Sequence, residues 1–199
     1  MVELLVATRN AKKLKEIKEL LSGLKIKVTS LADYKDMPHI EEDGKTFAEN
    51  AVKKAATISL YTQKLVMGED SGLEVRFLKN APGVYSARFS GSLATDKKNN
   101  VKLLKCLKGV PMNKRQARYR CCAALTDEKG IVDVVSGSCS GMIALQPKGT
   151  NGFGYDPLFL IPRFNKTFGE LNPSIKSKMS HRAHALKKFK HVIEKYLSR

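Results

Sequence analysis

Hydrophobic side chains along the chain change repeatedly between short continuous runs and helical spacing. Residues 3–7 are apolar and β-prone, whereas the stretch behind Thr8-Arg9-Asn10 carries hydrophobic residues three or four positions apart. These apolar positions are Leu14, Ile17, Leu21 and Leu24. Their spacing predicts an amphipathic helix, and Asn10 is suited to cap its first turn. The chain is therefore predicted to open as a strand, a tight turn and a helix.

The same patterns predict the elements that follow. Thr46 is suited to cap a second helix, and the short buried strand at 65–68 runs into Glu69-Asp70-Ser71-Gly72 before β character resumes at 73–77. Further elements are a helix at 96–107, two long strands at 116–125 and 131–145, a strand at 157–161 and a helix with apolar positions from Ala183 to Tyr196. This mixture indicates an α/β protein built on a long, twisted mixed sheet, with residues 1–199 forming a single domain.

Composition narrows the class of protein. The 199 residues are 42% hydrophobic, which is enough for a sizeable core. No apolar run approaches the roughly 20 residues of a membrane span. The first residues lack the basic leader of a signal peptide, so we expect a cytoplasmic protein without a membrane partner. The four cysteines form no CxxC pair, which makes a zinc site improbable and favours reduced thiols.

The formal net charge of +17 suits a polyanionic partner. Nucleotides, nucleic acids and anionic membranes all fit this description. The charge fits equally well with a solvated, lysine-rich surface that has no partner. The net charge therefore favours binding of a triphosphate, but it does not distinguish a triphosphate from other polyanions.

Two stretches carry candidate chemistry near the predicted strand ends. Thr8, Asn10 and Lys13 surround a helix N-terminus, where free N–H groups favour phosphate, although an ordinary capped helix has the same residues. Glu69 and Asp70 lie where an apolar strand is predicted to end, which suits a metal or a proton transfer as well as an acidic turn. The acidic loop Glu41-Glu42-Asp43-Gly44 either supplies a further carboxylate to Mg²⁺ or is a solvated loop.

Two later stretches contain groups that fit a base. Phe153 stands between glycines in Gly149–Pro157, where its ring either stacks on a flat ligand or packs in the core. Lys176, His181 and Arg182 lie at or before the start of the last helix, with Ser180 as a possible cap. Their donors can bind a purine oxygen or phosphates, or can simply be basic surface groups at a capped helix.

Taken together, and in this order, these stretches resemble one family, the inosine triphosphate pyrophosphatases, which act on non-standard purine nucleoside triphosphates. The resemblance covers the chain from residue 4 to about residue 190. It rests on Ala7–Asn10 with Lys13, Glu41–Gly44, Glu49–Ala51 with Lys54, Glu69–Leu73, Ala81–Arg88, Gly152–Pro157, Thr167–Glu170 and Ser180–Arg182. It implies a sheet dividing two lobes around a central nucleotide-binding cleft, and a homodimer. The implied reaction is Mg²⁺-dependent hydrolysis of ITP, dITP and XTP to the monophosphate and pyrophosphate.

The resemblance also implies roles for single residues. Asp70 is the general base and a metal ligand, and Glu41 is the second acid at the metal. Arg88 is a weaker candidate at the rim or across the dimer. Substrate contacts fall to Thr8, Asn10, Lys13 and Lys54 at the triphosphate, to Ser71, to Phe153, Gly154, Tyr155 and Asp156 around the base, and to Lys176, His181 and Arg182 at the edge of the base.

Selectivity for the base requires a donor aimed at the 6-oxygen of hypoxanthine or xanthine, because that donor stays unsatisfied opposite the amino group of adenine. Arg182 is our hypothesis for this donor. Two alternatives remain open at this point. One is a basic nucleic-acid-binding protein. The other is a pyrophosphatase for modified pyrimidine triphosphates. The purine pyrophosphatase itself is expected to require no nucleic acid.

Overall fold

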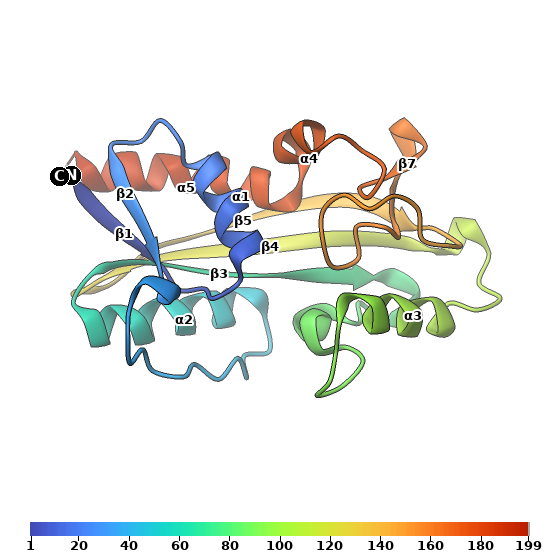
Figure 1. Ribbon diagram of the computed structural model, residues 1–199, viewed down its shortest axis with the longest axis horizontal. Helices are drawn as coiled ribbons and strands as arrows, with labels where there is room; N and C mark the ends of the chain where they lie inside the picture. Colours follow the sequence, from blue (N-terminus) through green and yellow to red (C-terminus); the bar gives the residue numbers. More distant parts are fainter. Residues whose placement is uncertain (199) are drawn as a thin grey trace. The chain divides into compact units, whose positions relative to one another are not determined.

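The computed structural model describes residues 1–198, and its strands form one seven-stranded mixed sheet (Figure 1). The strand order is β2-β1-β3-β4-β5-β6-β7. Strand β1 pairs in parallel with both β2 and β3, whereas β6 is antiparallel to β5 and to β7. Strands β4 and β5 are joined by only two residues, which requires an antiparallel hairpin. The predicted α/β class and mixed sheet are confirmed.

The strands are β1 Val2–Val6, β2 Ile26–Ser30, β3 Leu65–Val75, β4 Gln116–Asp127, β5 Gly130–Ile143, β6 Phe159–Ile161 and β7 Lys166–Thr167. The α-helices are α1 Ala11–Leu20, α2 Phe47–Thr62, α3 Asp96–Cys106, α4 Pro173–Met179 and α5 His181–Leu197. Within residues 1–198, no helix is both long and apolar enough to cross a membrane. The short strand β2 and the short helix α4 are absent from the sequence prediction, because neither is long enough to show a clear period.

The chain divides into two compact units. Unit 1 contains Met1–Asp70, Cys121–Gly137 and Arg182–Arg199, and unit 2 contains Ser71–Arg120 and Ser138–His181. Strands β3, β4 and β5 each contribute residues to both units. One prediction is wrong here, because β3 does not end at the acidic residues. It continues through Glu69 and Asp70, so these carboxylates belong to a regular strand instead of a turn.

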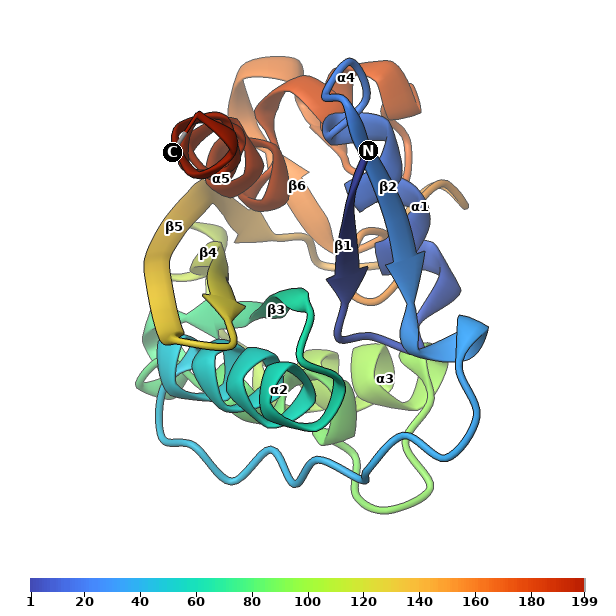
Figure 2. The ribbon, with the colours of Figure 1, turned by 90° about the vertical axis from the view of Figure 1, so that its left-hand side faces the viewer.

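In unit 1, α2 covers one face of the strands, and α1 and α5 cover the other (Figure 2). Helix α5 buries a stripe of Leu186, Phe189 and Ile193 in a core with Ile17 of α1 and Met67 of β3. This stripe has the spacing that the sequence predicted. On the opposite face α2 lies so close to β3 that a Cβ at Gly68 would stand 2.0 Å from the Ala51 carbonyl oxygen. Glycine is therefore required for this contact.

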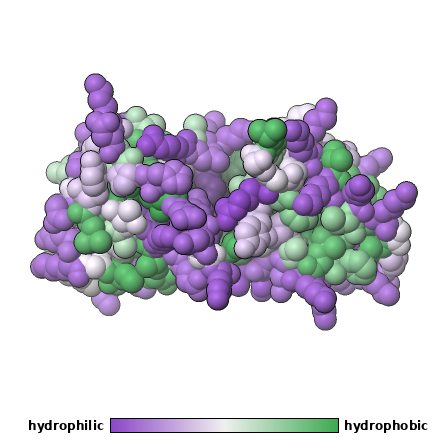
Figure 3. Space-filling view, turned by 90° about the horizontal axis from the view of Figure 1, so that it is seen from below, coloured by the Kyte–Doolittle hydropathy of each residue, from purple (hydrophilic) through white to green (hydrophobic). Residues whose placement is uncertain are grey.

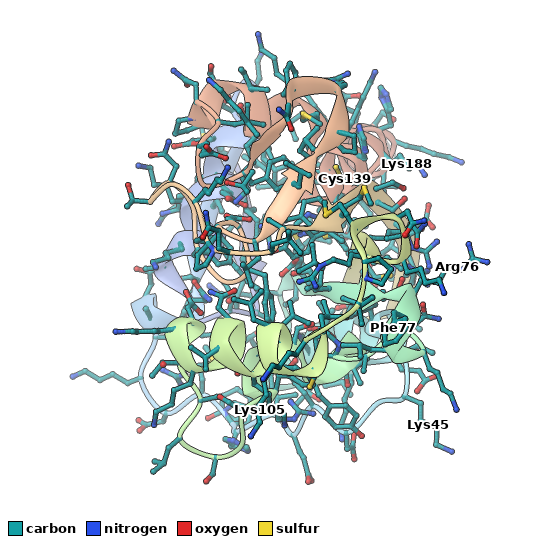
Figure 4. All side chains as sticks on the ribbon, turned by 90° about the vertical axis from the view of Figure 1, so that its right-hand side faces the viewer. Lys45, Arg76, Phe77, Lys105, Cys139 and Lys188 are labelled. Atoms are coloured by element: carbon teal, nitrogen blue, oxygen red, sulfur yellow. The ribbon has the colours of Figure 1, made fainter. Side chains whose placement is uncertain are left out.

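Unit 2 has a separate core with an aromatic centre. Tyr119 and Phe159 have ring centroids 4.5 Å apart, and Phe159 and Phe168 stack at 5.2 Å. Leu103 of α3 and Leu107, the residue that caps its C-terminus, belong to the same core. Figure 4 shows the side chain of Cys139 in the interior, in contrast to Arg76, which extends away from the end of β3. The aromatic cluster gives unit 2 a rigid base for the glycine-rich loop that follows β5.

Candidate active site

Asp70 is the centre of a charged cluster in unit 1. Its side chain is only 8% exposed, and Oδ1 accepts a hydrogen bond from Lys54 Nζ at 3.2 Å. The same ammonium group lies 2.9 Å from Oε2 of Glu42. Burial raises the pKa of Asp70 above its usual value, and the neighbouring Glu42 and Glu69 act in the same direction, against the opposing effect of Lys54. Asp70 is therefore a stronger base than an ordinary aspartate.

Glu42, and not Glu41, is the acidic-loop residue that contacts this cluster. Glu41 is exposed, and Glu42 is the glutamate of this loop that pairs with Lys54. Burial opposes ionisation of Glu42, but Lys54 holds the pKa of Glu42 below its usual value. In the same way, Asp70 and Glu42 outweigh burial and raise the pKa of Lys54. The structure places Glu42 at Lys54, and the metal contact predicted for Glu41 stays a prediction.

A second charged cluster lies beside the first, around Glu69. Oε2 of Glu69 pairs with Lys13 Nζ at 2.9 Å, and Oε1 pairs with Arg182 at 3.0 Å. Although burial would raise it, the pKa of Glu69 is held well below its usual value by Arg182 and Lys13. Cys121 also donates to Glu69 at 3.2 Å. Glu69 thus fixes two cations that the sequence assigned separately to the phosphates and to the base.

Arg182 is 1% exposed and is held on both sides by acids. Its second carboxylate partner is Glu16 of α1, which is 166 residues away in the chain. Burial lowers the pKa of Arg182, but Glu69 and Glu16 outweigh it and raise the pKa above the usual value. The predicted contact of Arg182 with a base stays a prediction, and any such contact must be made by a side chain that these two acids already orient.

The N-terminus of α1 is built as the sequence predicts. Oδ1 of Asn10 accepts from the backbone N–H groups of Lys12 and Lys13 at 3.0 and 3.1 Å, which confirms Asn10 as the cap. Thr8 accepts from the N–H of Asn10 at 3.2 Å. Thr8 is partly exposed and Asn10 is exposed, so the capped, positive end of the helix lies at the surface.

In unit 2 the glycine-rich loop is organised by Asp156, which is 2% exposed. Its Oδ2 accepts from the backbone N–H of Phe153 at 2.8 Å and from Lys176 Nζ at 2.7 Å. A Cβ at Gly152 would stand 1.9 Å from this oxygen, and the φ angle of Gly152 is +77°. The loop therefore needs glycine at this position both for space and for backbone conformation.

The predicted base-binding residues of unit 2 lie around this loop. Lys176 Nζ is 4.8 Å from the centroid of the partly exposed Phe153 ring. The hydroxyl of Tyr155 donates to the Ser86 carbonyl at 2.8 Å, and Gly154 donates its N–H to Asp96 at 2.8 Å. Phe153 is thus held beside a cation at the loop surface, while Tyr155 is a buried support. The structure brings Phe153, Asp156 and Lys176 together as one group.

Three further predicted residues of unit 2 are His181, Ser71 and Arg88, and the Arg88 guanidinium lies 5.1 Å from the centroid of the Tyr85 ring. The His181 ring stacks on Tyr119, with centroids 4.6 Å apart and planes 12° apart, and the residue is buried. Burial raises the pKa of Tyr119 well above its usual value, so its hydroxyl stays neutral. Ser71 follows Asp70 directly in β3 and is partly exposed.

A buried aspartate beside lysines and a helix N-terminus at the surface are features expected of phosphate-binding enzymes that act through carboxylates. The chain belongs to the Ham1 family, whose model matches residues 4–192. It is 46% identical over 194 residues to the dITP/XTP pyrophosphatase of Desulforamulus reducens, covering 98% of this chain and 96% of that protein.

Solved structures agree with this membership. A HAM1 protein from Coxiella burnetii superposes with a TM-score of 0.90 at 38% identity, covering 98% of this chain and 100% of that one. The nucleoside-triphosphatase / dITP/XTP pyrophosphatase from Mycobacterium abscessus gives a TM-score of 0.78, also at 38% identity, covering 94% and 97% of the two chains. The resemblance noted from the sequence is therefore confirmed.

Proposed function

We propose that this protein hydrolyses deaminated purine nucleoside triphosphates, namely ITP, dITP and XTP, to the monophosphate and pyrophosphate. The observation that carries this proposal is the buried Asp70, with Lys54 and Glu42 beside it, in a chain whose full-length relatives are named dITP/XTP pyrophosphatases. A cytoplasmic location fits an enzyme that acts on the nucleotide pool. Neither nucleic-acid binding nor a pyrimidine substrate is favoured by an observation of this kind.

The residues of unit 1 fit a magnesium ion bound together with a triphosphate. Glu42 and Asp70 both reach Lys54 Nζ, so two carboxylates converge on one cation. No three His, Cys, Asp or Glu side chains within residues 1–198 form a metal cluster, but Mg²⁺ needs only one or two protein carboxylates besides waters and phosphates. We assign Asp70 and Glu42 to this ion because both contact Lys54, whereas the family resemblance implies Glu41 as the second acid. Bound Mg²⁺ would neutralise charge on the phosphate oxygens.

The side chains of unit 1 then supply the remaining chemistry. Asp70 accepts the proton of the water that attacks the α-phosphorus, as the bond to the departing pyrophosphate breaks. Lys54 and Lys13 balance the charge that develops on the leaving group. Thr8 and Asn10 at the surface-exposed start of α1, together with the positive end of the helix dipole, are assigned to the phosphate oxygens. Phe153 and Lys176 are assigned to the base, as the family resemblance implies.

The decisive experiment compares ITP, XTP, GTP and ATP, with and without Mg²⁺, and measures pyrophosphate and orthophosphate. We expect Mg²⁺-dependent pyrophosphate from ITP and XTP and little from GTP and ATP. Absence of pyrophosphate with all four purine nucleotides would overturn the proposal. Release of orthophosphate in place of pyrophosphate would contradict the site of cleavage.

We also propose that the protein is a homodimer formed through unit 2. Apolar side chains of this unit are exposed beside a surface pocket of about 540 Å³ lined by Pro82, Tyr85 and Phe89, and Figure 3 shows hydrophobic residues gathered at the end of the face where α3 lies. Tyr85 is 59% exposed and Val101 61%. Sedimentation should give a dimer that Tyr85→Asp dissociates. A monomeric wild-type protein at all concentrations would contradict this assembly.

A further inference from the structure

Asn50 of α2 is a buried polar residue without a role in the chemistry described so far. It is 0% exposed and lies on the helix face that also carries Lys54 and Ala51. Burying an amide is unfavourable unless its donor and its acceptor are both satisfied. Both are satisfied here. Oδ1 accepts from the Gly44 backbone N–H at 2.8 Å, and Nδ2 donates to Oδ2 of Asp70 at 3.1 Å.

The two partners allow only one orientation of this amide. A backbone N–H can only donate, so it must face Oδ1 of Asn50. The NH₂ group then points to Asp70, whose ionised carboxylate can only accept. One side chain therefore links the end of the acidic loop to the proposed general base, and it binds Asp70 on the oxygen that Lys54 does not use.

The acidic loop is closely fitted to Asn50. A Cβ at Gly44 would stand 2.6 Å from Oδ1 of Asn50 and 2.9 Å from the Cβ of Glu49. Glu49 holds the next residue as well, because its carboxylate accepts from the Lys45 N–H at 2.8 Å. Glu42 lies only two residues before Gly44, so the anchor at Gly44 restricts where the Glu42 carboxylate can reach.

We infer that Asn50 is a positioning residue that fixes the acidic loop to Asp70. The carboxylates of Glu42 and Asp70 thereby face the same place, where they contact Lys54 and where the proposed Mg²⁺ would bind. The two hydrogen bonds are independent of any ligand. The role of these hydrogen bonds in catalysis rests on the proposed pyrophosphatase function. Asn50 touches neither the phosphates nor the metal in this scheme, and its effect is transmitted through Asp70 and the loop.

Two substitutions separate the two hydrogen bonds. Asn50→Ala removes both bonds. Asn50→Asp has the same shape and keeps an acceptor for the Gly44 N–H, but it replaces the donor to Asp70 by a second carboxylate. It also keeps the test available if Asn50→Ala does not fold. Thr57→Ala, two turns along α2 and partly exposed, is the control for general disturbance of the helix.

The first readout is hydrogen exchange of the Gly44 amide by NMR on the intact protein without nucleotide. We expect exchange at least ten-fold faster in Asn50→Ala, and wild-type rates in Asn50→Asp and Thr57→Ala. Unchanged exchange in Asn50→Ala, or equal acceleration in both Asn50 variants, would overturn the inference. Because this measurement needs no turnover, it gives its answer even if the enzyme proves inactive on purine triphosphates.

The second readout is Mn²⁺ binding followed by electron paramagnetic resonance, together with steady-state kinetics on ITP. Asn50→Ala should bind Mn²⁺ at least ten-fold more weakly and lower kcat by at least ten-fold, with KM for ITP nearly unchanged. Asn50→Asp should lower kcat although its loop stays anchored. Wild-type Mn²⁺ affinity and kcat in Asn50→Ala would refute a positioning role. A wild type without pyrophosphatase activity would refute only the proposed function.

Discussion

Each unit of the molecule contains a buried aspartate paired with a buried lysine, and the two pairs differ in their surroundings. Asp70 and Lys54 of unit 1 are 3.2 Å apart among further ionised groups, with Glu42 and Glu69 close enough to raise the pKa of Asp70. Asp156 and Lys176 of unit 2 are 2.7 Å apart, and the Phe153 backbone N–H and the rings of Phe153 and Phe168 lie around them.

This difference in surroundings suits the Asp70–Lys54 pair to a reaction and the Asp156–Lys176 pair to holding a loop. Additional carboxylates around Asp70 make its charge costly, so a second cation or a proton is easily accepted there. Asp156 is instead paired with Lys176 and accepts from the Phe153 backbone N–H, which favours one fixed loop conformation. The same residue pair can therefore serve a reaction in one unit and hold a binding loop in the other. Substitutions in the two units test this contrast.

Asp70→Asn should abolish most activity and leave the fold intact. An amide cannot accept the proton of the attacking water, so kcat for ITP should fall by about 10²–10⁴-fold. Pyrophosphate release measures the loss, and circular dichroism with thermal unfolding checks the fold. Activity within a factor of ten of wild type would exclude Asp70 as the general base.

Asp156→Asn should reduce stability much more than a surface substitution does. It leaves Lys176, which is 7% exposed, without its carboxylate, and breaking a buried ion pair costs about 3–5 kcal/mol. Urea unfolding would measure this change. Asp133→Asn, at an exposed position of β5, is the control and should stay within about 0.5 kcal/mol of wild type. Equal stability of the two variants would show that Asp156 does not fix the loop.

Phe153→Ala should weaken substrate binding without affecting the bond-breaking step. Loss of stacking on a base costs about 1–3 kcal/mol, so KM for ITP should rise about ten-fold while kcat changes little. Phe153→Tyr keeps the ring and is expected to behave like wild type. If both substitutions raise KM equally, the ring is not the contact with the base.

The smallest effect is expected at a partly exposed ion pair of unit 1, which serves as a reference for solvent screening. Glu3 accepts from Lys64 at 2.7 Å and from the hydroxyl of Tyr34, and these bonds, against the effect of burial, lower its pKa from 4.5 to about 2. Because the pKa is lower in the folded state, the stabilisation is complete above pH 4.5 and is lost as the pH falls toward 2.

Glu3→Gln should therefore lower the free energy of unfolding at pH 7 by only about 1 kcal/mol, because solvent screens the pair. At pH 2 the difference from wild type should be much smaller. Urea unfolding at both pH values measures this. A difference that grows toward pH 2 would mean that the sign of the pKa shift is wrong.

Local patterns predicted most of the secondary structure correctly. Asn10 and Thr46 cap α1 and α2 as expected, because a cap depends only on residues two or three positions away. The stripe on α5 was likewise visible in the sequence, since the helical period is a local property. The strand around Glu69 and Asp70 was misplaced, because two adjacent acids resemble a turn unless distant cations are known to neutralise them.

Local patterns and the order of the motifs were enough to predict the α/β class, the helix caps and the family. The folded structure was needed to show that Glu42 and not Glu41 reaches Lys54, that Arg182 lies between Glu16 and Glu69, and that Asn50 joins Gly44 to Asp70. A polar residue on the apolar face of α2 was the one signal that could have indicated Asn50. The physical reason is that ion pairs and buried hydrogen bonds depend on which groups share a low-dielectric interior, and residues as far apart as 16 and 182 meet there only after the chain has folded.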